Sequence, residues 1–90
     1  MGIALIKYKL MPEGMLENFE ELKENISKIV EKYEGKVNQL IEEPIAFGLK
    51  AIILVVAMDE SKETDKLEES LRNLKGISSM DTIDYRRAIE

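Results

Sequence analysis

The sequence predicts an α+β fold with elements in the order β-α-β-β-α-β. Apolar residues alternate with polar ones near the start of the chain, recur at steps of three or four in two later segments, and form one continuous run in the middle. That order is typical of the ferredoxin-like sandwich. No stretch of the 90 residues resembles a linker, so we expect residues 1–90 to form a single domain.

A strand is expected over residues 3–11, where one face carries Ala4, Ile6, Tyr8 and Leu10. Pro12 and Gly14 are expected to end it. An amphipathic helix over residues 16–33 should follow, because its apolar residues recur at helical spacing: Leu16, Phe19, Leu22, Ile26, Ile29, Val30 and Tyr33. Gly35 is placed to end this helix.

The middle of the chain predicts two strands. Residues 37–43 form a short polar segment, which is typical of an edge strand. A connection from Pro44 to Gly48 leads to the run from Leu49 to Met58. That run is apolar on both faces and rich in branched residues, so it is expected at the centre of the sheet.

The last third predicts a helix and a strand. Thr64 is expected to cap the helix, and Gly76 to end it. The apolar positions of this helix are spaced by four and three: Leu67, Leu71 and Leu74. The final strand is expected over residues 77–87.

The crossovers of such a chain are right-handed, which gives an antiparallel sheet in the order 4-1-3-2, counting strands along the chain. Both helices then cover one face. The open face of the third strand should carry an apolar stripe, formed by Ile52, Leu54, Val56 and Met58 or by the alternate set. Such a stripe indicates a contact. A weak homodimer through the open sheet face and a different protein partner both stay open.

The amino-acid composition excludes several kinds of catalytic group. The chain has no cysteine and no histidine, so it has no thiol nucleophile and no imidazole base. Carboxylates are adjacent at residues 42–43, 59–60 and 68–69, but such pairs are typical of solvated charge, and we expect no metal and no cofactor. Acylphosphatases share this fold but need an arginine after the first strand, where this chain reads PEGMLEN.

Net charge and hydropathy indicate which partners and which cellular compartment to expect. The net charge of −5 argues against direct nucleic-acid binding, which needs clustered cations. No segment approaches the roughly 18 continuous apolar residues of a membrane helix. The first ten residues contain lysines within their apolar stretch, unlike a signal peptide. We therefore expect a cytoplasmic protein without a membrane partner.

Two features remain as candidate functional residues. Phe47 is one of only two phenylalanines, and it lies between Pro44 and Gly48. Arg86 and Arg87 form the only pair of adjacent basic residues. The aromatic ring would either fold back over the core or contact a partner. The arginines would either solubilise the end of the chain or act on a partner.

Three segments carry a family resemblance: EEPIAFGLKAIILVVAMDE, TDKLEESL and SSMDTIDYRRAI. They resemble archaeal elongation factor 1-beta and the C-terminal exchange domain of its eukaryotic counterpart. The similarity spans nearly the whole chain and is most specific around the proline, the aromatic residue and the glycine before the apolar run. It implies a ferredoxin-like guanine nucleotide exchange factor without chemistry of its own, which promotes GDP release from the elongation factor 1-alpha GTPase during translation elongation.

The resemblance also implies which residues contact the partner. Phe47, with Pro44 and Gly48 around it, would be an apolar anchor. The eukaryotic family ends close to an essential lysine that is thought to disturb the magnesium site of the partner, and this place aligns with Arg87, next to Arg86. The two regions should lie roughly 30 Å apart, since they are at opposite ends of strands of nine or ten residues.

A second interpretation is a small ferredoxin-like regulatory or oligomerisation module. Such a module would bury Phe47 and pair through the open face of the sheet. An exchange factor would leave Phe47 exposed and act as a monomer.

Overall fold

The computed structural model describes residues 2–13, 19–46 and 48–88. The predicted positions Gly14, Leu16 and Phe47 lie outside these residues. The elements are β1 (Ile3–Pro12), α1 (Phe19–Lys32), β2 (Lys36–Pro44), β3 (Lys50–Asp59), α2 (Asp65–Arg72) and β4 (Ile77–Ala88).

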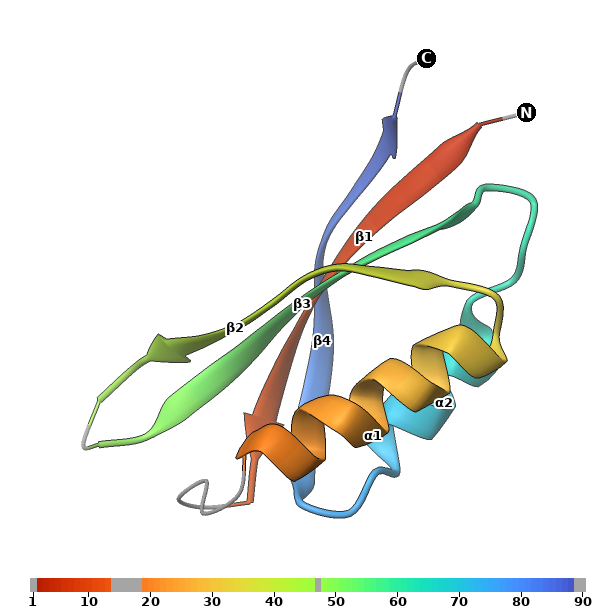
Figure 1. The fold of residues 1–90 in the computed structure, drawn as a ribbon. Helices are drawn as coiled ribbons and strands as arrows, with labels where there is room; N and C mark the ends of the chain where they lie inside the picture. Colours follow the sequence, from red (N-terminus) through yellow and green to blue (C-terminus); the bar gives the residue numbers. More distant parts are fainter. Residues whose placement is uncertain (1, 14–18, 47, 89–90) are drawn as a thin grey trace.

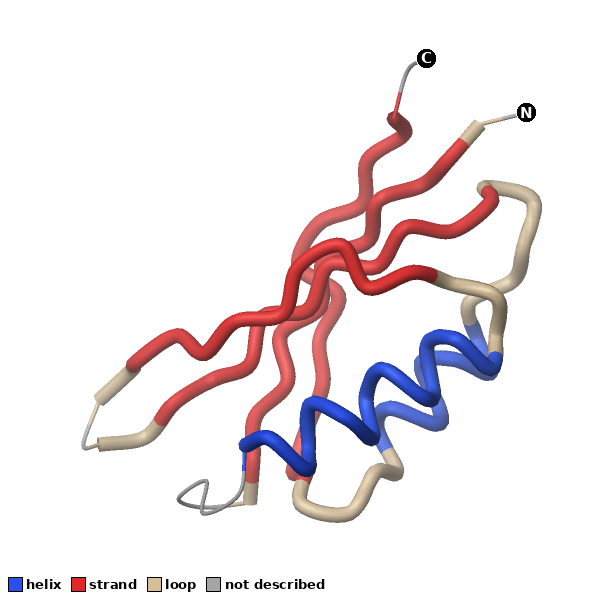
Figure 2. The backbone as a smooth tube through the Cα atoms, viewed as in Figure 1, coloured by secondary structure: helices blue, strands red, loops and turns tan. Residues whose placement is uncertain are grey.

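The four strands form one antiparallel sheet in the order β2-β3-β1-β4, and both helices lie on the same face of it (Figure 1). The predicted ferredoxin-like fold is confirmed, with the strand order 4-1-3-2 and a central β3. The start of β1 and the end of β4 lie side by side at one end of the sheet, while the β2–β3 connection lies at the opposite end (Figure 2).

The core lies between the sheet and the helices. β1 and β3 contribute alternate residues, as strand geometry requires: Ala4, Ile6, Tyr8, Leu10, Ile52, Leu54, Val56 and Met58. The helices contribute residues spaced by four: Leu22, Ile26 and Val30 from α1, and Leu67 and Leu71 from α2. All of these side chains are at most 7% exposed. None of the described helices is long and apolar enough to cross a membrane.

The end of α1 differs from the prediction. Glu34, rather than Gly35, adopts the left-handed backbone, with φ of 64°. The N–H of Gly35 donates to the carbonyl of Val30 at 2.9 Å, and the N–H of Glu34 donates to that of Glu31 at 3.0 Å, which together form a Schellman motif. Gly35 is needed for space, because a Cβ there would lie 3.0 Å from side-chain carbons of Val30 and Val56.

α2 also differs in detail. Thr64 precedes the helix but makes no side-chain capping hydrogen bond, so the predicted cap is wrong. Its backbone is already near-helical, with φ of −102° and ψ of −5°, whereas a capping residue usually has extended dihedrals. The helix ends at Arg72, and Leu74 packs half-buried against the core beyond it. Gly76, with φ of 97°, then leads into β4.

The open face of β3 carries the alternate set: Ala51, Ile53, Val55 and Ala57. Ala51 and Ile53 are only 0% and 3% exposed, although neither of the described helices covers this face. Lys9 lies opposite Ile53 and Lys7 lies opposite Val55, and lysine stems can cover apolar neighbours. The apolar stripe is therefore partly covered by the sheet itself. Pairing of two copies through this face stays a prediction.

Candidate functional site at the two ends of the sheet

The β2–β3 connection is a closed turn. The N–H of Ile45 donates to the carbonyl of Leu49 at 2.9 Å, and the N–H of Leu49 donates to that of Ala46 at 3.1 Å. Gly48 lies at the third position of the inner turn with φ of 74°, where glycine is favoured. A Cβ on Gly48 would meet nothing within 4 Å, so backbone conformation rather than crowding favours glycine here.

This turn presents apolar side chains to solvent. Ile45 and Leu49 are 37% and 36% exposed, and Pro44, at the end of β2, is exposed as well. We call Pro44 to Leu49 the β2–β3 tip. Phe47 was predicted from the sequence and lies outside the described residues, whereas Ile45 and Leu49 were not predicted. Their signal was present, because they are the apolar residues nearest to the proline and the glycine.

The two arginines lie on opposite faces of the sheet. Arg86 is opposite Leu5 in the register of β4 and β1, and Arg87 is opposite Ala4. Ala4 belongs to the buried face under the helices, so Arg87 lies on the helix-side face and Arg86 on the open face. The side chain of Arg86 is 77% exposed, and that of Arg87 is 74% exposed. Both residues belong to β4 and not to an extension beyond it.

Each arginine has an acidic partner. The Nε–H of Arg86 donates to Oδ2 of Asp84 at 2.8 Å, on the same strand. Nε of Arg87 lies 3.0 Å from Oε2 of Glu60, which follows β3. We call this region, with both arginines and their partners, the arginine end.

The β2–β3 tip and the arginine end are separated by the length of the sheet. β3 begins beside the tip at Lys50, and its end pairs with the start of β1, which in turn pairs with the end of β4. Ten residues at about 3.3 Å each give a separation of about 30 Å. The longest dimension of the protein is 42 Å, which accommodates this distance.

The acidic pairs at residues 42–43, 59–60 and 68–69 do not converge. One carboxylate of each pair has a different partner: Glu42–Lys50 at 3.6 Å, Glu60–Arg87 at 3.0 Å and Glu68–Tyr8 at 3.0 Å. Within residues 2–13, 19–46 and 48–88, no three acidic side chains gather where they could hold a metal ion.

Tyr8 connects β1 to α2. Its ring is fully buried, and its hydroxyl donates to Oε2 of Glu68 at 3.0 Å. Burial raises the pKa of Tyr8 well above its ordinary value of 10.0, and the negative charge of Glu68 raises it further. The neutral phenol is therefore the form that the fold stabilises.

The contribution of Tyr8 should depend on pH. Below pH 10 the phenol is protonated in the folded and unfolded states, so its stabilising effect is complete. Above pH 10 the unfolded chain ionises first, and the free energy of unfolding should fall by about 1.4 kcal/mol per pH unit from this group. Tyr8→Phe should cost about 1–2 kcal/mol at pH 8 and show a smaller further loss by pH 11. Urea unfolding of both proteins at the two pH values measures this, and equal losses would contradict it.

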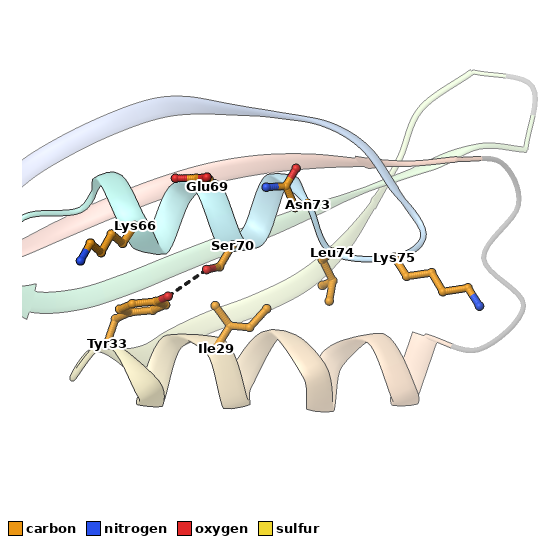
Figure 3. Close-up of a pocket in the computed structure, with 8 residues that line it drawn as sticks. All are labelled: Ile29, Tyr33, Lys66, Glu69, Ser70, Asn73, Leu74 and Lys75. Carbon is orange, nitrogen blue, oxygen red and sulfur yellow. Dashed lines mark hydrogen bonds between the residues drawn. The ribbon is translucent and has the colours of Figure 1, made fainter.

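A shallow groove of about 610 Å³ runs between α1 and α2. Its lining comes from both helices and from the residues that directly follow each of them: Ile29, Tyr33, Lys66, Glu69, Ser70, Asn73, Leu74 and Lys75 (Figure 3). The hydroxyls of Tyr33 and Ser70 are hydrogen-bonded across it at 3.0 Å. The groove shares no residue with the β2–β3 tip or the arginine end.

A solved structure supports the fold. The ACT domain of a GTP pyrophosphokinase from Chlorobium tepidum matches with a TM-score of 0.61, covering 91% of this chain and 88% of that domain. At 12% identity this likeness concerns the ferredoxin-like architecture alone.

Sequence comparisons identify the family to which this chain belongs. The model of the EF-1 guanine nucleotide exchange domain matches residues 5–87, a span that includes the β2–β3 tip and both arginines. Elongation factor 1-beta of Methanocaldococcus jannaschii is 36% identical over 89 residues, which cover 98% of this chain and all of the relative. The protein of that name from Methanothermobacter thermautotrophicus is 38% identical, over 97% of this chain and 98% of its own. The chain therefore belongs to the EF-1 guanine nucleotide exchange domain family, and its role is nucleotide exchange in translation elongation.

Proposed function

We propose that residues 1–90 act as one exchange domain that promotes GDP release from elongation factor 1-alpha in the cytoplasm. The chain carries out no chemistry of its own. A protein that accelerates release needs only a surface that binds the nucleotide-free partner more tightly than the GDP-bound partner, because an equilibrium shifts only by differential affinity. This requirement fits a chain without cysteine or histidine.

The β2–β3 tip provides the apolar contact. Phe47 is the anchor, and it lies between Pro44 and Gly48 in the sequence. Ile45 and Leu49 support this role, because both present apolar surface to solvent beside Phe47 in the sequence. A central aromatic residue with smaller apolar neighbours is a common arrangement in a binding hot spot.

The arginine end provides the second contact. Arg86 and Arg87 place positive charge near the metal and the phosphates of the bound nucleotide, where a cation competes for the interactions that retain GDP. One observation carries the proposal: an exposed apolar tip and two exposed arginines lie at opposite ends of the same sheet. A surface with two distant contacts suits a partner with more than one domain.

The test is the release of labelled GDP from purified archaeal elongation factor 1-alpha. Adding this chain should accelerate release, and the rate should rise to a plateau as its concentration increases. The released nucleotide should be recovered as intact GDP, because no bond is broken. An unchanged rate at all concentrations would overturn the exchange activity, and a hydrolysed nucleotide would overturn the absence of chemistry.

A further inference from the structure

The ion pair of Arg87 spans a strand. Glu60 follows β3 and Arg87 lies near the end of β4, and these strands are not neighbours, because β1 lies between them. Nε of Arg87 and Oε2 of Glu60 are nevertheless 3.0 Å apart. The pair of Arg86 with Asp84 is different, since it joins residues two apart on one strand.

Small residues at the start of the chain make this contact feasible. A Cβ on Gly2 would lie 3.0 Å from Cδ and from Oε2 of Glu60, so the carboxylate occupies the space that a side chain would take. Next along β1 on the same face is Ala4, which pairs with Arg87. The backbone N–H of Glu60 donates to the carbonyl of Gly2 at 3.0 Å, which fixes the backbone of Glu60 relative to β1.

The turn that carries Glu60 is held at several points. Oδ1 of Asp59 accepts hydrogen bonds from the backbone N–H of Ser61 at 2.9 Å and from its hydroxyl at 2.8 Å. Lys62 forms an ion pair with Glu34 at the end of α1. The side chain of Glu60 is 30% exposed, compared with 74% for its partner. The backbone that carries Glu60 is therefore held in place, its carboxylate is the less exposed member of the pair, and the guanidinium stays accessible.

We propose that Glu60 is a positioning residue for nucleotide exchange, which holds the guanidinium of Arg87 at the helix-side face of the sheet end. This inference rests on the proposed function. A long side chain loses rotamer freedom when it binds, and one that is already held loses less. Among the described residues, the ion-pair partner of Arg86 is Asp84 on its own strand, so the inference also selects Arg87 as the arginine that acts on the nucleotide site.

Glu60→Gln removes the charge and keeps the size of the side chain. This variant should lower the GDP release rate at saturating factor about three- to fivefold. A change of this size matches the coupling free energy of an exposed ion pair. The concentration needed for half-maximal release should change little, because the β2–β3 tip is intact. Asp84→Asn, the matched control for Arg86, should stay within about twofold of the wild type. A faster release for Glu60→Gln would show that the carboxylate competes with the partner, and would overturn the positioning role.

Gly2→Ala provides a second variant in which both charges are kept. Its Cβ should move the carboxylate, which is the flexible end of the side chain, by a few tenths of an ångström without disturbing the core. Release should slow by less than in Glu60→Gln, because the ion pair is loosened but not removed. The double variant Glu60→Gln with Arg87→Ala should be no slower than Arg87→Ala alone, because Glu60 acts only through Arg87. An additive defect would overturn the inference.

The pair can also be observed without the GTPase. The Nε–H signal of Arg87 in ¹⁵N NMR should report restricted motion in the wild type and greater motion in Glu60→Gln and Gly2→Ala. If the wild-type chain does not accelerate GDP release, the proposed function fails. If it does, and Glu60→Gln retains the full rate or the Arg87 signal is unchanged, only the positioning role fails.

Discussion

Replacing Phe47 by alanine should weaken binding to elongation factor 1-alpha by about 2 kcal/mol or more, which is roughly 30-fold in Kd. The reason is the size of the aromatic ring, which buries more apolar surface in a partner pocket than any other side chain of the β2–β3 tip. Isothermal titration calorimetry with the nucleotide-free partner measures the difference.

Two controls belong to this prediction. Ile45→Ala and Leu49→Ala should each cost less than about 1 kcal/mol of binding, as residues around a hot spot usually do. The Phe47→Ala variant should lose less than about 1 kcal/mol of stability in urea, as is usual for surface changes. A loss of several kcal/mol of stability would instead indicate that the ring caps the core.

Arg87→Ala should slow GDP release at saturating factor by about 10- to 150-fold, because losing one charge-assisted hydrogen bond costs roughly 1.5–3 kcal/mol. Docking should weaken much less, because the β2–β3 tip remains. Arg87→Lys should retain activity if charge alone matters, although lysine lacks the planar fork of arginine. Arg86→Ala should have the smaller effect. The measurements are the plateau rate and the half-maximal concentration for each variant.

Deletion of residues 86–90 should reproduce the defect of Arg87→Ala while the fold survives. Most of the buried side chains belong to β1, β3 and the two helices, so a thermal melt should show a modest loss of stability. Full exchange activity in a folded truncated chain would remove both arginines from the mechanism, and the β2–β3 tip would have to account for exchange alone.

The fold was predictable because the composition of each strand indicates its position in the sheet. The segment from Leu49 to Met58 is apolar on both faces, and a strand of this kind is stable only between two neighbours. Residues 37–43 are polar, so the strand that they form can lie at the edge of the sheet. Those two constraints, with right-handed crossovers, leave the strand order that the structure has.

The details that the sequence could not supply depend on backbone angles and on contacts across the sheet. Thr64 is a common capping residue, but whether it caps depends on its dihedrals. Glycine usually takes the left-handed position after a helix, yet Glu34 takes it here because Gly35 is needed for packing beside Val56. The pairing of Glu60 with Arg87 joins residues far apart in the chain, so no local pattern could indicate it.

The length of β3 sets the distance between the two proposed contacts. Because the two proposed contacts lie at opposite ends of the same sheet, each pair of residues added to the β2–β3 hairpin, one in each strand, would move the tip about 3.3 Å further from the arginines. An odd insertion would also turn every later side chain of the strand to the wrong face. The hairpin is therefore constrained in length as well as in composition, whereas the connections beside the helices can change size without altering the span between the contacts.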